Sequence, residues 1–269
     1  MYSQRVKRLS AALTGLCLLL SACASQQGAA TPPAPPAPPA AAAPAKPTIP
    51  TVAATTPQLR TDTVKRHQFI LTSVRKGGHE IAFLGASIME RWETVGKENW
   101  NAVWLPRHAV NCGISGDRTQ HVLARLDDGL LDALAAPGRG GEGGNNIRWF
   151  IINIGSNNLS DDSAPDVAAG IEAIITRLRT RLPDAHIALS AVLPRGQHPT
   201  PVREKAAAIN ALLTTYLSTC EPTHVHLMDM GPKFLDANGD IPADLMPDFL
   251  HPSATGYRIW SDELEKIIR

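Results

Sequence analysis

The sequence predicts a three-layer α/β domain in which helices cover both faces of a five-stranded parallel sheet. Short, almost continuously apolar runs alternate with longer segments in which apolar residues recur every three or four positions. A continuous apolar run indicates a strand covered on both faces, as in a parallel sheet. The alternation of strand and helix indicates crossover connections. Strands are therefore expected at residues 80–85, 109–112, 148–155, 186–193 and 225–229.

Helices are expected between these strands. Apolar residues recur at helical spacing over residues 119–134 and 164–182, and similar patterns cover 203–217 and 257–268. A shorter helix at 88–92 is expected directly after the first strand. All of these elements lie in the last part of the chain, from residue 59 to residue 269. A segment of that length is enough for a single domain with a sizeable core.

The first 58 residues have a composition typical of export and tether segments. Three cations precede an apolar stretch at 11–20, which is too short to span a bilayer and is typical of a secretory signal peptide. Small residues before Cys23 resemble the bacterial lipobox, which implies a signal peptide at 1–22 and a lipidated Cys23. An ordinary signal peptide is the alternative. Residues 23–58 are rich in Ala and Pro and are expected to form an extended linker rather than a proline-rich recognition segment.

By the same resemblance, the residue after Cys23 bears on where the protein is sorted. Ala24 is not acidic, which suggests the outer membrane, facing the periplasm, rather than the inner membrane. The expected localisation is therefore the bacterial cell envelope, with membrane attachment through the N-terminal lipid.

Charge and cysteine usage exclude several classes of protein. Without the three cations of the export segment, 23 basic residues stand against 25 acidic ones, and no basic stripe with interleaved aromatic residues suggests nucleic acid as a partner. No cluster of His, Cys and carboxylate residues has zinc spacing, so no metal is expected. Outside the first 23 residues the cysteines are Cys112 and Cys220, which we expect to be buried free thiols rather than a disulfide.

Four short clusters carry the chemistry that the sequence suggests. Three of them, at 85–87, 111–117 and 155–158, each close an apolar run, and the fourth, at 248–251, precedes the last predicted helix. Active sites of parallel α/β sheets lie at the carboxyl ends of the strands, where the first three clusters fall. Together the clusters offer a nucleophilic serine, donors for an oxyanion and an Asp/His pair, which is the set of groups that acyl transfer needs.

Ser87, Gly116 and Asn157 are the candidates within the first three clusters. Taken singly, each has a simpler interpretation: Ser87 as a helix N-cap, and the other two as turn residues. Their placement favours function, because a backbone N–H and a side-chain amide just past neighbouring strands can both be directed at one developing negative charge.

Asp248 and His251 form the most specific pair. A spacing of three residues on a turn lets the Asp carboxylate reach Nδ1 of the imidazole, which leaves Nε2 to accept a proton from a serine. The sequence therefore predicts a Ser-His-Asp triad of Ser87, His251 and Asp248.

The four clusters resemble the conserved blocks of the SGNH (GDSL-type) hydrolases. Within that family they are most similar to the catalytic subunits of intracellular platelet-activating factor acetylhydrolase. The resemblance extends over 59–269 and is carried by the stretches 113–126, 155–158, 193–205 and 248–251. It implies a flavodoxin-like fold with five parallel strands and an esterase that needs no cofactor.

The resemblance also implies a role for each site residue. Ser87 would be the nucleophile, His251 the base and Asp248 the residue that orients it. The N–H groups of Ser87 and Gly116 and the amide of Asn157 would form the oxyanion hole.

Three neighbouring residues qualify this assignment. Ile88 and Leu250 adjoin Ser87 and His251, and the matching positions in the acetylhydrolases hold bulky residues that crowd the acyl group, so both are expected to line the acyl pocket. One departure is Ala86, where the family usually has Asp. We expect weaker local support for the nucleophile but intact chemistry.

The function expected from the sequence is a lipid-anchored serine esterase of the cell envelope that hydrolyses short-chain, chiefly acetyl, esters through an acyl-enzyme. Its substrate is expected to be an acetylated carbohydrate or a short-chain phospholipid. Two alternatives remain open: a lysophospholipase or thioesterase that takes longer acyl chains, and a catalytically weak envelope-binding lipoprotein.

Overall fold

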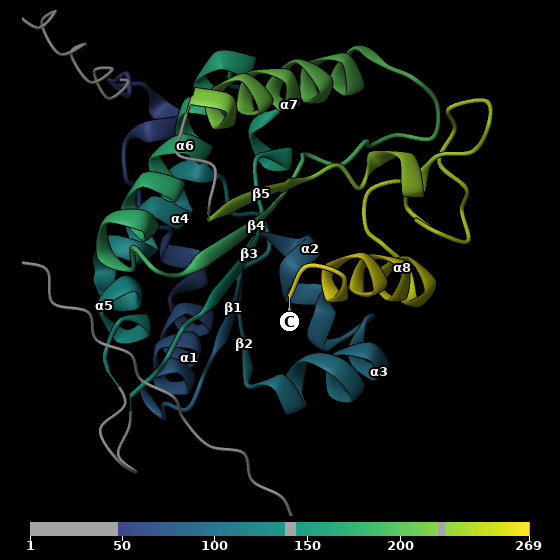
Figure 1. Ribbon diagram of the computed structural model, residues 1–269. Coiled ribbons are helices and arrows are strands. Elements are labelled where there is room, and N and C mark those ends of the chain that lie inside the picture. Colours follow the sequence, from purple (N-terminus) through teal and green to yellow (C-terminus); the bar gives the residue numbers. More distant parts are fainter. Residues whose placement is uncertain (1–47, 138–143, 220–223, 269) are drawn as a thin grey trace, which may run out of the picture. The chain divides into compact units, whose positions relative to one another are not determined.

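A single five-stranded parallel sheet forms the centre of the computed structural model (Figure 1). The structure describes residues 48–137, 144–219 and 224–268. The strand order of the sheet is β2-β1-β3-β4-β5, and all four strand pairs are parallel, which confirms the predicted sheet. The strands are β1 Ile81–Gly85, β2 Ala109–Gly113, β3 Trp149–Asn153, β4 His186–Ser190 and β5 Val225–Met228.

Helices cover both faces of the sheet, as predicted (Figure 1). One face carries α1 Val64–Arg75, α4 Thr119–Arg125, α5 Leu131–Leu134, α6 Ala164–Arg181 and α7 Pro201–Thr219. The other face carries α2 Ser87–Glu90, α3 Lys97–Asn99 and α8 Ala254–Glu265. Because side chains alternate along a strand, Ala82 and Leu84 of β1 enter the core under the first set, whereas Ile81 and Phe83 enter the core under the second.

The core beneath α8 is aromatic and supports the end of β1. The ring of Phe83 makes edge contacts with Trp92, Trp100 and Trp104 at centroid distances of 5.4, 5.0 and 5.2 Å. Tyr257 of α8 is buried in the same cluster, and its hydroxyl donates a hydrogen bond to the carbonyl of Ile88 at 2.7 Å. The α8 layer therefore fixes the backbone immediately after Ser87.

Three helical segments differ from the sequence prediction. The helix predicted at 119–134 is divided into α4, a turn at Leu126–Leu130 and α5, because Gly129 adopts a positive φ of 86°. Helices α1 and α3 were not predicted, although the buried Ile70, Leu71 and Val74 of α1 have helical spacing.

Of the two predicted buried thiols, Cys112 is buried and free in β2, and burial raises its pKa to about 12. Cys220 lies outside the described residues, as do the predicted signal peptide and Cys23. No helix of the described segments is both long and apolar enough to cross a membrane.

The described residues begin at 48, so they include residues 48–58 of the segment that was expected to be a linker. A short 3-10 turn at Ala53–Thr55 packs on α4 and α6, with Ala54 completely buried. The hydroxyl of Thr119 donates to the carbonyl of Ala54 at 2.8 Å. The sequence alone did not indicate this contact, because an Ala-rich segment is also typical of a linker. Here the small side chain of Ala54 is what allows the turn to pack closely on α4 and α6.

Gly170 of α6 tests that contact. A Cβ at this position would lie 2.5 Å from Oγ1 of Thr119 and 2.7 Å from the carbonyl oxygen of Ala54. In an open helix, replacing Gly by Ala stabilises by about 0.5–1 kcal/mol. Here we expect Gly170→Ala to destabilise by about 1–3 kcal/mol, because overpacking forces the neighbours apart. Urea unfolding of both proteins measures the change, and an increase in stability would contradict the packing.

Candidate active site

The strand register brings three predicted site residues to one edge of the sheet. Gly85, the last residue of β1, pairs with Gly113 of β2 on one side and with Asn153 of β3 on the other. The chain then leaves each strand toward the same edge, where Ser87 follows β1 and the β2–α4 loop (residues 114–118) follows β2. Asn157 lies in a 3-10 turn, Ser156–Asn158, just beyond β3.

Ser87 opens α2, which rests directly on the end of β2. A Cβ on Gly113 would overlap the backbone nitrogen of Glu90, so only glycine allows this approach. The amide of Asn111 donates to the carbonyl of Met89 at 2.7 Å, and its oxygen accepts the N–H of Gly113 at 2.9 Å. The sequence did not single out Asn111 for this role. A buried Asn at an apolar strand end was the available signal.

Ser87, His251 and Asp248 are joined in one hydrogen-bonded chain. Nε2 of His251 lies 2.8 Å from Oγ of Ser87, and Nδ1 lies 2.7 Å from Oδ2 of Asp248. A carboxylate can only accept, so Nδ1 carries the proton and Nε2 is the acceptor for the Ser87 hydroxyl. The structure thus brings together the three residues that the sequence proposed as a triad.

Asp248 is held as a carboxylate by its own turn. Its Oδ1 accepts the backbone N–H groups of His251 and Leu250 at 2.7 and 3.2 Å. Partial burial acts to raise the pKa of Asp248, but the hydrogen bonds from the backbone and ring of His251, together with that from Leu250, hold this pKa below its usual value. The carboxylate is therefore charged at neutral pH and fixes the tautomer of His251.

The turn between Asp248 and His251 contains an unusual backbone conformation. Phe249 adopts φ 55°, a left-handed value that is an outlier for a bulky residue. Its carbonyl accepts the N–H of Gly196, in the loop after β4, at 2.8 Å. Such strain persists only where the surroundings impose it, and no local pattern in the sequence indicates it.

The β2–α4 loop is fixed by side chains on both sides. Gly116 has φ 81°, which favours glycine. Glu90 of α2 accepts both the backbone N–H and the hydroxyl of Ser115, at 2.6 and 2.5 Å. The Asn157 amide donates to the carbonyl of Asp117 at 2.9 Å, which fixes the plane of the amide. Since an amide has two N–H donors, its second one remains available to a ligand.

Comparisons with known proteins identify the family to which the chain belongs. A sequence model described as the GDSL-like lipase/acylhydrolase family matches residues 83–259. The chain belongs to this family. It is 35% identical to the human platelet-activating factor acetylhydrolase IB subunit alpha1 over 191 residues, which is 71% of this chain and 75% of the relative. The mouse subunit alpha2 is 32% identical over 205 residues, covering 76% and 82% of the two chains.

Solved structures of distant sequence share the fold. A GDSL-like lipase from Bacteroides thetaiotaomicron superposes with a TM-score of 0.56 at 16% identity and covers 76% of this chain and 98% of its own. An acetylxylan esterase from Geobacillus stearothermophilus gives a TM-score of 0.51 at 18% identity, covering 71% and 94%. The chain is therefore an SGNH-type α/β hydrolase in its architecture, as predicted.

Ala86, the departure from the usual family pattern, leaves the turn before the nucleophile intact. Its side chain is buried in the core under α1 and α4, and its carbonyl accepts the N–H of Glu90 at 2.9 Å. Ile88 is buried in the opposite core beside Ser87, and Leu250 is half-buried beside His251.

Proposed function

We propose that this family member is a serine esterase that hydrolyses short-chain, chiefly acetyl, esters. The observation that carries the proposal is the chain of hydrogen bonds from Ser87 through His251 to Asp248, with lengths of 2.8 and 2.7 Å. In this order the imidazole can take the hydroxyl proton while the carboxylate stabilises the imidazolium that forms.

The proposed reaction has two halves. Oγ of Ser87 attacks the ester carbonyl carbon as Nε2 of His251 takes the hydroxyl proton, which produces a tetrahedral oxyanion. The bond to the alcohol then breaks, and the alcohol leaves with that proton while the acyl group stays on Ser87. Water repeats the sequence with His251 as base, and the carboxylic acid leaves as Ser87 regains its proton.

We assign the stabilisation of the oxyanion to three hydrogen-bond donors. These are the N–H groups of Ser87 and Gly116 and the second N–H of the Asn157 amide. Support comes from the strand register, which places all three after paired strand ends, and from the hydrogen bonds that fix the β2–α4 loop and the amide plane. Donors held in place before the reaction stabilise the developing charge without reorganisation.

The acyl preference is assigned to Ile88 and Leu250. Both adjoin catalytic residues, and the acetylhydrolase relatives at 32–35% identity support acetyl as the group removed. The proposed ester substrate is an O-acetylated carbohydrate or a short-chain phospholipid. Longer-chain activity, as in a lysophospholipase or thioesterase, is the rival that a chain-length series decides.

The proposed location is the bacterial cell envelope, with the chain anchored through a lipidated Cys23 to the outer membrane on its periplasmic side. The lipobox-like residues before Cys23 and the Ala/Pro-rich stretch after it support this location.

Ser87→Ala tests the proposal as a whole. Because only the hydroxyl is lost, we expect the unfolding midpoint to stay unchanged while kcat for a soluble acetyl ester falls by at least about four orders of magnitude. Ser218→Ala, an exposed serine on α7, is the matched control and should retain full activity. Turnover by Ser87→Ala at the wild-type rate would contradict the triad.

Leu250→Ala tests the acyl assignment. Removing this side chain should open room beside His251 and shift the ratio of octanoate to acetate hydrolysis upward, since each methylene in a pocket is worth about 1–3 kcal/mol. Leu212→Ala, on α7, is the control. An equal loss of kcat/KM at every chain length would mean that Leu250 only packs the loop, and a wild type that prefers octanoate would defeat the short-acyl proposal.

Cys23→Ser tests the anchor. The variant should move from the membrane fraction to the soluble fraction, whereas Cys220→Ser should stay with the membranes. Mass spectrometry of the wild-type N-terminus provides the second readout. A mature protein without lipid on Cys23 would show that the chain is exported by an ordinary signal peptide.

A further inference from the structure

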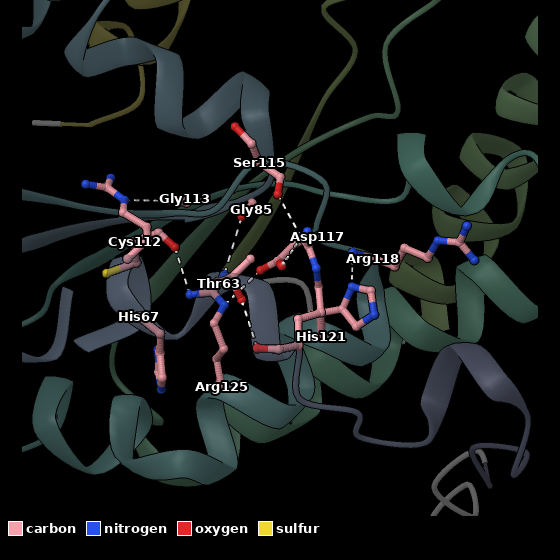
Figure 2. A network of polar contacts seen from close by, with 12 residues as sticks. Thr63, His67, Gly85, Cys112, Gly113, Ser115, Asp117, Arg118, His121 and Arg125 are labelled. Carbon is pink, nitrogen blue, oxygen red and sulfur yellow. Dashed lines mark hydrogen bonds and ion pairs between the residues drawn. The ribbon is translucent and has the colours of Figure 1, made fainter. Parts of the chain in front are cut away.

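Behind the β2–α4 loop lies a buried ion-pair network that the reaction scheme above does not use. Asp117 is its centre, with a side chain only 1% exposed. Nε of Arg125, which is 3% exposed, lies 2.8 Å from Oδ2 of Asp117, and Nη1 of Arg60 lies 3.2 Å from Oδ1. Figure 2 shows Asp117 and Arg125 facing each other beneath Gly85 and the loop. A carboxylate this deeply buried needs partners of opposite charge, and two guanidinium groups supply them.

Arg125 ties this network to the sheet. Its Nη1 donates to the carbonyl of Cys112 at 2.9 Å, and its Nη2 lies 3.4 Å from the carbonyl of Gly85 (Figure 2). These carbonyls stand at the ends of β2 and β1, the strands that lead to the loop and to Ser87. Arg125 therefore holds the Asp117 carboxylate in a fixed position relative to the ends of β1 and β2, and Ser87 follows the end of β1.

Arg60 acts on the loop itself. Its Nη1 donates to the carbonyl of Ser115 at 2.7 Å, and its guanidinium covers Gly116, where a Cβ would lie 2.9 Å from the same nitrogen. The Ser115 carbonyl and the Gly116 N–H belong to one planar trans peptide, so they point in opposite directions. A cation bound to that oxygen sets the direction of the N–H and polarises it as a donor.

The orientation of the Asn157 amide, the proposed side-chain donor of the oxyanion hole, also depends on Asp117. The Asn157 amide donates to the backbone carbonyl of Asp117, whose side chain both arginines hold. The orientation of Gly116 and that of Asn157 are therefore both set through Asp117 and Arg60. The other partner of Arg60, Asp62, is two-thirds exposed and contributes little.

We propose that Arg60 is a positioning residue of the esterase, which orients and polarises the Ser115–Gly116 peptide so that the Gly116 N–H stabilises the oxyanion. This proposal rests on the proposed function, because it requires Gly116 to be an oxyanion donor. Arg60 precedes α1 and lies outside residues 83–259, which the family model matches. A segment before the family domain would thus contribute to catalysis.

Arg60→Ala and Arg60→Lys test this role, with Arg177→Ala as the matched control. Arg177 also pairs with a partly exposed carboxylate, Asp127, but on the helical layer away from the loop. Rates for an acetyl ester are expressed per active site after complete titration with a fluorophosphonate, so that unfolded protein does not count.

For Arg60→Ala we expect kcat to fall by roughly 10- to 100-fold with KM within about twofold, somewhat less than the loss caused by removing a donor outright. Arg60→Lys should recover part of the rate, because an ammonium can bind the Ser115 carbonyl but cannot bridge to Asp117 in the same fork. The shape of the pH–rate profile should not change, since the Ser-His-Asp chain is untouched. Arg177→Ala should match the wild type.

Wild-type kcat per titrated site in Arg60→Ala would overturn the proposal, as would an equal loss in Arg177→Ala. Both results leave an active wild type, so they differ from failure of the proposed function, in which the wild type itself hydrolyses no ester.

Discussion

The close approach of α2 to the sheet is the constraint on which the rest of the site depends. Gly85 and Gly113 end two neighbouring strands, and a Cβ on either would overlap backbone atoms of Asn153 or of Glu90. Because Gly113 lacks a side chain, the helix that begins at Ser87 can lie directly on the end of β2, whereas Gly85 allows the close approach of β3. The nucleophile is thus fixed by backbone contacts, and these do not relax in the way that side-chain packing can.

The other site residues are placed relative to that contact. Asn111 bonds the carbonyl of Met89, Glu90 bonds Ser115, and Tyr257 bonds the carbonyl of Ile88, so α2 is linked to the β2–α4 loop and to α8. The His251 turn reaches Ser87 from the far end of the sequence. Here the strain at Phe249 is offset by hydrogen bonds within the turn and to Gly196. Each contact orders a catalytic group before substrate arrives, which is the condition for efficient acyl transfer.

The sequence predicted the sheet and most helices, and it singled out the three side chains that the structure joins by hydrogen bonds, because each leaves a local signal. Apolar runs mark covered strands, and the spacing of Asp248 and His251 matches a turn. The sequence did not predict the features that depend on contacts between residues far apart in the chain. Gly129 divides a helix whose apolar pattern is continuous.

The network around Asp117 shows this limit most clearly. Arg60 and Arg125 are 65 residues apart in the chain, and neither has a local pattern that distinguishes it from a solvated cation. Residues 48–58 resemble the linker in composition, yet Ala54 is buried through contacts with α4 and α6. Only the three-dimensional arrangement shows that these side chains support the loop opposite Ser87.

In the proposed reaction one serine, Ser87, is activated by His251 and forms the covalent intermediate. The most direct measurement is peptide mass spectrometry of the native protein after reaction with a fluorophosphonate. If Ser87 is the nucleophile, we expect one adduct per chain, on the peptide that contains Ser87, and no adduct in protein unfolded before the reaction. An adduct on another residue, or a native protein that forms none, would contradict it.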